Sequence, residues 1–269
     1  MTRSSRATGD ASPATSLARA FALLDLFSLG QPLLTVDGVM DRLGYTRSTA
    51  YRYLRDLTDA GLVTQSSAGA YSLGPRIVEL ERLMALTDPL YRAGEALLRD
   101  APCGNSALLL HNLYEDRVLC IYKSGPDALE DRGRRIVIRR ARGLPFPLFQ
   151  GAASLALLPY LSPHRIRQTY LRHAGAIAAS GLGTQWEEFR RHLGAIRRAG
   201  YATSHGTITP SVSGVAVPIL APGGKRVLGS LARAFATAAP PEGGEEACAA
   251  ELRGMAVKIA QACAQSSRH

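Results

Sequence analysis

Apolar side chains recur at helical spacing through the first sixty residues and predict three helices. The three helices are expected over residues 16–29, 36–43 and 47–60. Gly44 and Tyr45 form a tight turn between the second and third, and Thr46 is placed to cap the third helix. Two short helices joined by a turn that contains glycine are typical of a helix-turn-helix.

The third helix has an apolar side and a polar side when its residues are placed 100° apart. Ala50, Leu54 and Leu57 share the apolar side, which we expect to be buried. The opposite side carries two guanidinium groups, a hydroxyl and a phenol, from Ser48, Tyr51, Arg52 and Arg55. Arginine can donate twice to a guanine edge, and hydroxyl groups bind bases or phosphates. This helix is therefore predicted to read DNA.

A short hairpin follows the third helix. Residues 62–65 and 70–73 have strand character, and small polar residues separate them. A hairpin directly after a recognition helix is the wing of a winged helix-turn-helix. The order of these elements predicts sequence-specific binding to double-stranded DNA.

A helical pattern over residues 76–99 connects this region to the rest of the chain. Pro89 is expected to divide the pattern into two helices. The apolar stripe of such a linker either forms a dimer contact or packs on the second domain, and the pattern favours neither.

The remainder of the chain alternates strand and helix patterns. Strands are expected over residues 107–110, 118–122, 135–140, 212–220 and 226–232, and helices over residues 152–161, 163–173, 186–198 and 245–265. This order predicts an α+β fold with an antiparallel sheet. The expected organisation is a disordered leader (1–14), a winged helix-turn-helix (15–74), a linker and dimerisation helix (75–100) and an effector-binding domain (101–269).

Residues 43–65, LGYTRSTAYRYLRDLTDAGLVTQ, resemble the winged helix of the IclR family of bacterial regulators. Thr49, Arg52, Leu54 and Gly61 occupy that family's typical positions. Residues 71–84 resemble its second wing strand and linker helix. Residues 140–161 and 199–220 resemble its effector domain, a GAF-like fold. Ser154 and Leu155 replace the family's usual Gly-Lys pair.

The resemblance implies a regulator that responds to a small organic acid, often an aromatic one. The DNA-binding residues expected from the helix and the resemblance are Thr46, Arg47, Ser48, Thr49, Tyr51, Arg52 and Arg55. The expected effector-binding residues are Arg142, Phe146, Phe149, Gly151, Ala152, Ser154, Ser213 and Val215. A helix start near residue 151 would attract a carboxylate, and the two phenylalanines would form an apolar wall. The alternative is that these aromatic residues belong to an ordinary core.

The positive charge of the chain is concentrated in the second domain, not in the predicted DNA-binding domain. The formal net charge is +10 at pH 7, yet the basic and acidic residues before Leu80 nearly balance. The excess lies in the second domain, where arginines crowd residues 132–142. We interpret this cluster as a charged strand edge, with a second polyanion or effector site as the alternative.

Motifs for other functions are missing from the sequence. It has no G-x-S-x-G elbow, P-loop or H-E-x-x-H, and its four cysteines form no C-x-x-C pair. We therefore predict no catalytic residues, no metal and no cofactor. No apolar run is long enough for a membrane span, and the polar first residues are unlike a signal peptide, so the cytoplasm is expected.

These observations favour a ligand-responsive transcription regulator that binds its operator as a homodimer or tetramer. Two alternatives remain open at this stage. One is a constitutive DNA-binding protein whose second domain serves only oligomerisation. The other is an enzyme with an appended DNA-binding domain, which the missing catalytic motifs disfavour.

Overall fold

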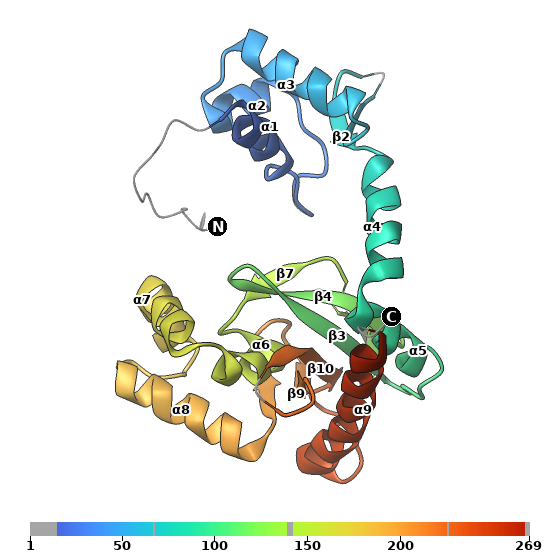
Figure 1. Ribbon diagram of the computed structural model, residues 1–269, viewed down its shortest axis with the longest axis vertical. Coiled ribbons are helices and arrows are strands. Elements are labelled where there is room, and N and C mark those ends of the chain that lie inside the picture. Colours follow the sequence, from blue (N-terminus) through green and yellow to red (C-terminus); the bar gives the residue numbers. More distant parts are fainter. Residues whose placement is uncertain (1–14, 67, 139–141, 225, 267–269) are drawn as a thin grey trace. The chain divides into compact units, whose positions relative to one another are not determined.

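The computed structural model describes residues 15–66, 68–138, 142–224 and 226–266. It divides into two compact units, Met1–Leu86 and Thr87–His269 (Figure 1). The expected leader, residues 1–14, lies outside the described residues. Helices first and a curled antiparallel sheet afterwards confirm the α+β fold class.

The first unit is a three-helix core followed by a wing. Its elements are α1 (Ser16–Leu24), α2 (Val36–Leu43), α3 (Arg47–Asp59), β1 (Val63–Gln65), β2 (Tyr71–Leu73) and α4 (Arg76–Thr87). Thr15, Thr35 and Thr46 each accept a backbone N–H at the start of α1, α2 and α3, which satisfies a donor that has no partner within the helix. Gly44 ends α2 in the left-handed conformation, as C-cap glycines do.

The wing is tied to the helices by backbone contacts. β1 and β2 are antiparallel, and Leu34 exchanges two backbone hydrogen bonds with Tyr71, at 2.8 and 2.7 Å. Gly74 lies directly after β2, where a Cβ atom would stand 2.2 Å from the carbonyl oxygen of Gly61. Only glycine permits this approach of the chain after α3 to the end of the wing.

The first helix is shorter than its pattern suggested. It ends at Leu24, whereas the spacing of apolar residues predicted an end near residue 29. Ser28 and Gln31 instead exchange backbone hydrogen bonds in a tight turn, which leaves Leu29 77% exposed. The backbone groups of this segment are satisfied within the turn, so the apolar side chain there does not require a helix.

The second unit is built around a six-stranded antiparallel sheet in the order β7-β4-β3-β10-β9-β8. Its strands are β3 (Ser106–Tyr114), β4 (Arg117–Ser124), β7 (Pro145–Pro147), β8 (Ala202–His205), β9 (Val212–Leu220) and β10 (Val227–Ala236). Its helices are α5 (Pro89–Leu98), α6 (Gly151–Leu157), α7 (Pro163–Ala179), α8 (Trp186–Ala199) and α9 (Gly244–Ser266), with a 3₁₀ turn at Leu158–Tyr160.

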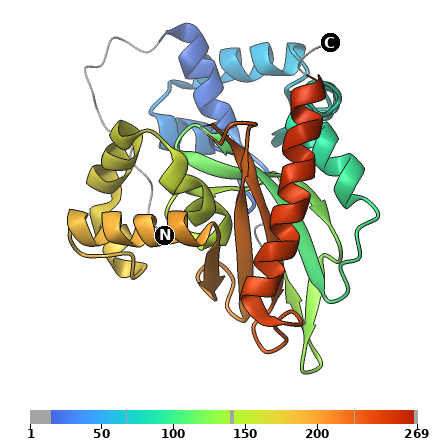
Figure 2. The same cartoon turned by 60° about the horizontal axis from the view of Figure 1, so that its bottom comes forward.

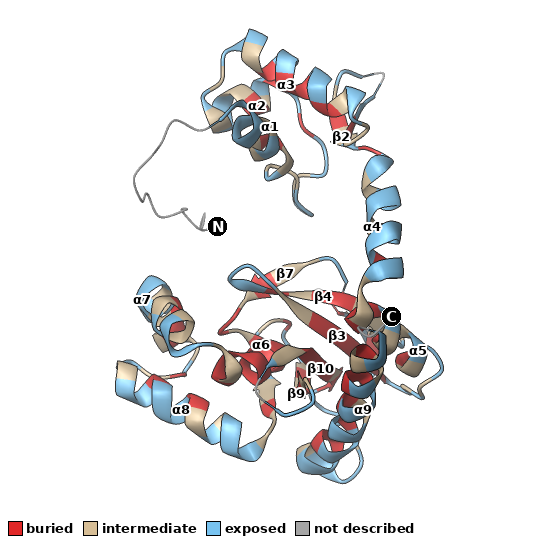
Figure 3. Ribbon diagram, in the orientation of Figure 1, coloured by how far each residue is buried: buried red, intermediate tan, exposed pale blue. Residues whose placement is uncertain are grey.

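Helices cover both faces of this sheet, as Figures 1 and 2 show for α6 and α9. The Ser230 hydroxyl donates to the carbonyl of Ala153 in α6, at 3.0 Å. Three residues along β10, Arg233 donates to Glu251 in α9, at 2.7 Å. Because side chains alternate along a strand, these two contacts mark opposite faces of the sheet. The burial pattern in Figure 3 follows this arrangement, with buried residues concentrated in α6 and the central strands.

Two segments of the second unit differ from the expected pattern. The strand predicted at residues 135–140 is β6 (Arg134–Val137), which pairs with β5 (Ala128–Asp131) in a separate hairpin. Arg139 and Arg140 of the arginine cluster lie outside the described residues. The helix expected to end at His173 has a break at that residue, where φ is −131°, but continues to Ala179.

Candidate DNA-reading face and ligand cavity

The polar side of α3 is exposed and borders a groove beside the wing. Ala50, Tyr53, Leu54 and Leu57 are buried, which anchors the opposite side of the helix in the core. The groove, of about 520 Å³, is lined by Ser48, Tyr51, Arg52, Arg55, Thr58, Gln65 and Tyr71. All four residues of the predicted reading side therefore lie together, and the wing adds Gln65 and Tyr71.

The remaining predicted DNA-binding residues lie at the start of α3. Thr46 caps the helix by accepting the backbone N–H of Thr49, and its hydroxyl contacts the hydroxyls of Ser48 and Thr49. Arg47 forms an ion pair with Asp37 of α2 in which both side chains are more than half exposed. Exposed ion pairs are weak, so this pair leaves Arg47 able to exchange its partner for a phosphate.

Arg52 is held in place by an aromatic contact. Its guanidinium lies 4.8 Å from the centre of the Tyr53 ring. That contact restricts the long side chain without occupying its hydrogen-bond donors with a carboxylate. A helix with an oriented arginine and neighbouring hydroxyls can contact base edges and phosphates in a major groove.

The second unit contains a partly open cavity of about 80 Å³ against the α6 side of the sheet. Apolar side chains from several elements form most of its wall, namely Leu109, Ile138, Phe146, Ala152, Ala153, Ile208, Val212, Ala232 and Ala234. Its polar borders come from His111, Ser204, Thr209, Ser213, Gly214 and Arg233. A mostly apolar cavity with few polar groups is typical of a small-molecule site.

His111 is the most perturbed titratable group at this cavity. It is 2% exposed, and its Nδ1 has no hydrogen-bond partner among the described residues. Burial penalises the charged imidazolium and lowers the pKa of His111 to about 4. Its ring meets Phe146 edge to face, with centres 5.6 Å apart.

Three of the predicted effector residues border the cavity, and a fourth lies beside it. Phe146, Ala152 and Ser213 contribute to the wall. Gly151, at the start of α6, has a φ of +77°, and a Cβ atom there would stand 2.3 Å from Ile208, a wall residue. The backbone at Gly151 therefore packs directly against the cavity residue Ile208.

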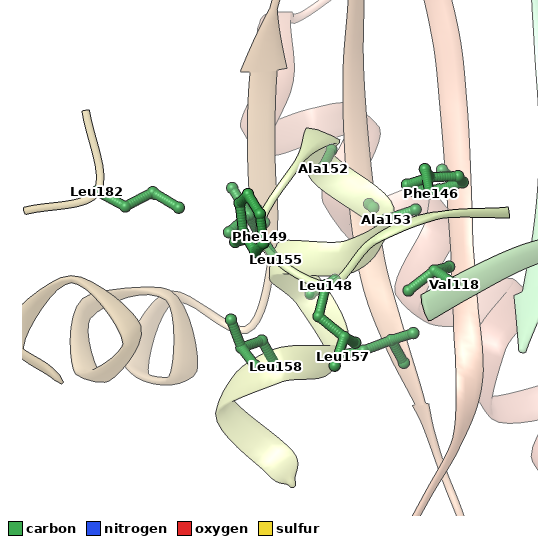
Figure 4. Close-up of a cluster of buried hydrophobic side chains, with 14 of the residues drawn as sticks. Val118, Phe146, Leu148, Phe149, Ala152, Ala153, Leu155, Leu157, Leu158 and Leu182 are labelled. Carbon is green, nitrogen blue, oxygen red and sulfur yellow. The ribbon is translucent and has the colours of Figure 1, made fainter. Parts of the chain in front are cut away.

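The other four predicted effector residues lie elsewhere. Phe149 packs against His173, with ring centres 5.1 Å apart, and Ser154 donates to the carbonyl of Pro147. Val215 is the register partner of Arg233 and so shares the α9 face. Arg142 donates to the carbonyl of Ile121 and lies over Tyr91. Figure 4 shows Phe149 beside Leu155 and Phe146 beside Ala153, so the two rings serve different parts of the core.

His111 and the loop residues Ile208 and Thr209 were not among the site residues predicted from the sequence. A histidine within the apolar run of residues 107–113 is the one signal that could have suggested a buried polar site. The loop residues carry no such signal, because their position at the cavity depends on how β8 and β9 pair.

The described residues contain neither a candidate metal centre nor a candidate membrane-spanning helix. No group of three or more His, Cys, Asp or Glu side chains there is arranged to hold a metal ion. No helix in the same part of the chain combines the length and the apolar character that crossing a membrane requires.

Two family models match the chain. The model of the IclR helix-turn-helix domain matches residues 16–67, and that of the bacterial transcriptional regulator IclR C-terminal domain matches residues 106–261. Among characterised proteins, the chain is similar to the HTH-type transcriptional regulator KipR of Bacillus subtilis (strain 168). The two are 24% identical over 209 residues, which span 76% of this chain and 79% of that protein.

Solved structures show the same architecture. An IclR transcriptional regulator from Alicyclobacillus acidocaldarius matches with a TM-score of 0.75 and 28% identity, over 92% of this chain and 98% of that one. An IclR homolog from Microbacterium hydrocarbonoxydans, complexed with 4-hydroxybenzoate, matches with a TM-score of 0.67 and 22% identity. That match covers 93% of this chain and 100% of the other.

Proposed function

Because the chain belongs to the IclR family of bacterial transcriptional regulators, we propose that it binds operator DNA as a dimer and responds to a small organic acid. Membership establishes a DNA-binding regulator with an effector domain, and not an enzyme. The proposal adds the residues that read DNA, the dimer and the class of effector. The cytoplasm, where chromosomal operators lie, is the proposed location.

The exposed side of α3 carries the DNA-reading part of the proposal. Ser48, Tyr51, Arg52 and Arg55 border one groove together with the wing. Arg52 and Arg55 supply donors for guanine edges, and the hydroxyls of Ser48 and Tyr51 supply base or phosphate contacts. Thr46, Arg47 and Thr49 at the helix start are proposed to contact the phosphate backbone.

An exposed apolar surface on α1 and α4 supports a dimer. Leu17 and Phe21 of α1 are 65% and 46% exposed, and Val78 of α4 is 70% exposed. Figure 3 shows α4 as exposed along most of its length. Large exposed apolar side chains are typical of interaction sites, and a two-fold operator requires a second copy of this chain. A tetramer of this chain would form by association of two such dimers.

The cavity of the second unit carries the effector part of the proposal. Its apolar wall and small volume suit a single ring or a short chain. The similar regulator from Microbacterium hydrocarbonoxydans is complexed with 4-hydroxybenzoate, an aromatic acid of that size. We therefore propose a small organic acid, with aromatic acids as the first candidates.

The experiment first selects an operator from random DNA and then adds candidate acids. Fluorescence anisotropy measures operator affinity at fixed salt, and thermal unfolding measures whether an acid binds the folded protein. We expect at least one acid to raise the unfolding temperature and to change operator affinity. An acid that stabilises the protein without changing operator affinity would contradict the regulatory link. Stabilisation by no acid would favour a constitutive DNA-binding protein whose second unit only oligomerises.

A further inference from the structure

We propose that His111 receives the acidic group of the effector and that each acid binds together with one proton taken from solution. This inference rests on the proposed effector function and specifies its chemistry. It follows from the kind of polar groups that border the cavity and from the state of His111 before the ligand arrives.

The described residues that line the cavity provide little positive charge to compensate an ionised carboxylate. Most of the wall is apolar, and Ser204 and Thr209 contribute only hydroxyl groups. Arg233 is the one described cation at the border, but its guanidinium donates to Ser106 at 3.2 Å and to Glu251 at 2.7 Å. Because Glu251 belongs to α9, that ion pair is directed to the other face of the sheet, and of the guanidinium nitrogens of Arg233 only the buried Nε has no hydrogen-bond partner among the described residues.

His111 supplies the group that can accept a proton. It borders the cavity, it is almost completely buried, and its Nδ1 has no partner among the described residues. A buried polar atom without a partner carries a cost that a ligand hydrogen bond would remove. Burial keeps the ring neutral near pH 7 by lowering its pKa to about 4, and the backbone of Ser230 and Leu109 offsets only part of that shift.

The titratable groups around His111 do not provide the missing charge. Its register partner on β4 is Cys120, a buried thiol whose pKa is raised to about 12 by burial. On β10 the charged residue is Arg233, whose guanidinium pairs with Glu251 of α9. The β7 strand presents Phe146 and α6 presents Ala152 and Ala153, none of which titrates.

The proton balance follows from these states. Before binding, His111 is neutral and a typical carboxylic acid is ionised near pH 7. A carboxylate buried beside a neutral imidazole would be an uncompensated charge, which is strongly unfavourable. One proton from solution, shared between the carboxylate oxygen and the imidazole nitrogen, makes the pair neutral overall. Affinity is therefore expected to fall by up to about tenfold for each unit that the pH rises.

The test measures proton uptake by titration calorimetry with the full chain. Benzoate, 4-hydroxybenzoate and butyrate are titrated near pH 7 in buffers with different ionisation enthalpies, which gives the number of protons taken up. We expect a value close to one for each acid that binds and a value close to zero for benzamide, a neutral ligand of similar shape. Binding of an acid without proton uptake would overturn this inference and leave the effector proposal intact. If none of the acids binds, both fail.

A histidine variant identifies the proton acceptor. His111→Gln keeps a polar side chain of similar size but cannot take up the proton, so we expect acid affinity to fall at least tenfold. The matched control is His192→Gln, which changes an exposed histidine on α8. Unchanged operator affinity in the absence of acid shows that the variants are folded and active in DNA binding.

Nitrogen-15 spectra of histidine-labelled protein provide a signature that a purely structural role of His111 would not give. On saturation with the acid, the ring nitrogens of His111 are expected to move toward imidazolium values, and the absence of these signals in His111→Gln assigns them. A ring that stays neutral while the acid is bound, or equal acid affinity in both variants, would contradict the assignment.

Discussion

Acid should destabilise the second unit through His111, because this histidine is neutral and buried in the folded protein. The folded pKa of about 4 lies below the ordinary value of 6.5. Protonation therefore favours the unfolded chain once the pH falls below about 6.5. The His111 contribution is complete above that pH, is lost progressively as the pH falls, and stops changing below about 4.

The magnitude follows from the same two pKa values. The difference is about 2.5 units, and each unit corresponds to about 1.4 kcal/mol, so the full loss is about 3 kcal/mol. At pH 5, about 1.5 units below the unfolded value, the expected loss is about 2 kcal/mol. A loss of this size is a large part of the stability of an ordinary domain.

Trp186 makes this prediction measurable in the correct unit. It is the only tryptophan of the chain and lies at the start of α8. Urea unfolding followed by its fluorescence therefore reports on the second unit. Wild type, His111→Gln and His192→Gln are compared between about pH 7.5 and pH 5. The stability difference between wild type and His111→Gln should change by about 2 kcal/mol over this range. The His192→Gln control should follow wild type.

The comparison isolates His111 from every other group that titrates. Acidic residues change charge in all three proteins and cancel in the difference. A difference between wild type and His111→Gln that stays constant across the pH range would refute the buried neutral histidine. That result would also remove one support of the proton-uptake proposal.

Three further predictions concern DNA binding and assembly. Arg52→Ala should lose about 1–3 kcal/mol of binding preference for the selected operator over scrambled DNA, measured by fluorescence anisotropy at fixed salt. The control Arg42→Ala should keep that preference, and full preference in Arg52→Ala would contradict the reading role. Gly74→Ala should destabilise the wing by about 1–3 kcal/mol or more and weaken hydrogen-exchange protection in residues 63–73. The control Gly30→Ala should leave this protection unchanged, because a Cβ atom at Gly30 meets nothing within 4 Å. Val78→Glu should weaken dimer association at least about tenfold in sedimentation experiments, because burying a valine contributes about 1.5 kcal/mol or more. An unchanged dimer affinity would exclude this face of α4 from the dimer interface.

The sequence by itself determined the features that depend on short segments. Thr46 as N-cap, Gly44 at the turn and the buried set around Leu54 follow from helix capping and helix periodicity, which are local. The exposed polar side of α3 was predictable for the same reason. One helix fixes which of its residues share a side, and the core fixes which side is buried.

The cavity depended on tertiary structure. Residues from β3, β7, α6, β9 and β10 meet there, and the sheet order that brings them together is not written in any one segment. Arg142 is close to this region in sequence, yet its side chain donates to the carbonyl of Ile121. Val215 was expected at the cavity together with Ser213 because residues two apart in a strand share a side, but its partner Arg233 places Val215 on the α9 face.

His111 shows most directly what could not be predicted from the sequence. The sequence contains a histidine in an apolar strand, but it does not show that His111 pairs with Ser230 on β10, which lies more than a hundred residues away. Burial between those strands lowers its pKa, and their packing leaves its Nδ1 without a hydrogen bond. The polar side of α3 could be predicted because the residues that form it lie along one helix. The chemistry of the cavity is set by register and packing between distant strands, which only the folded chain specifies.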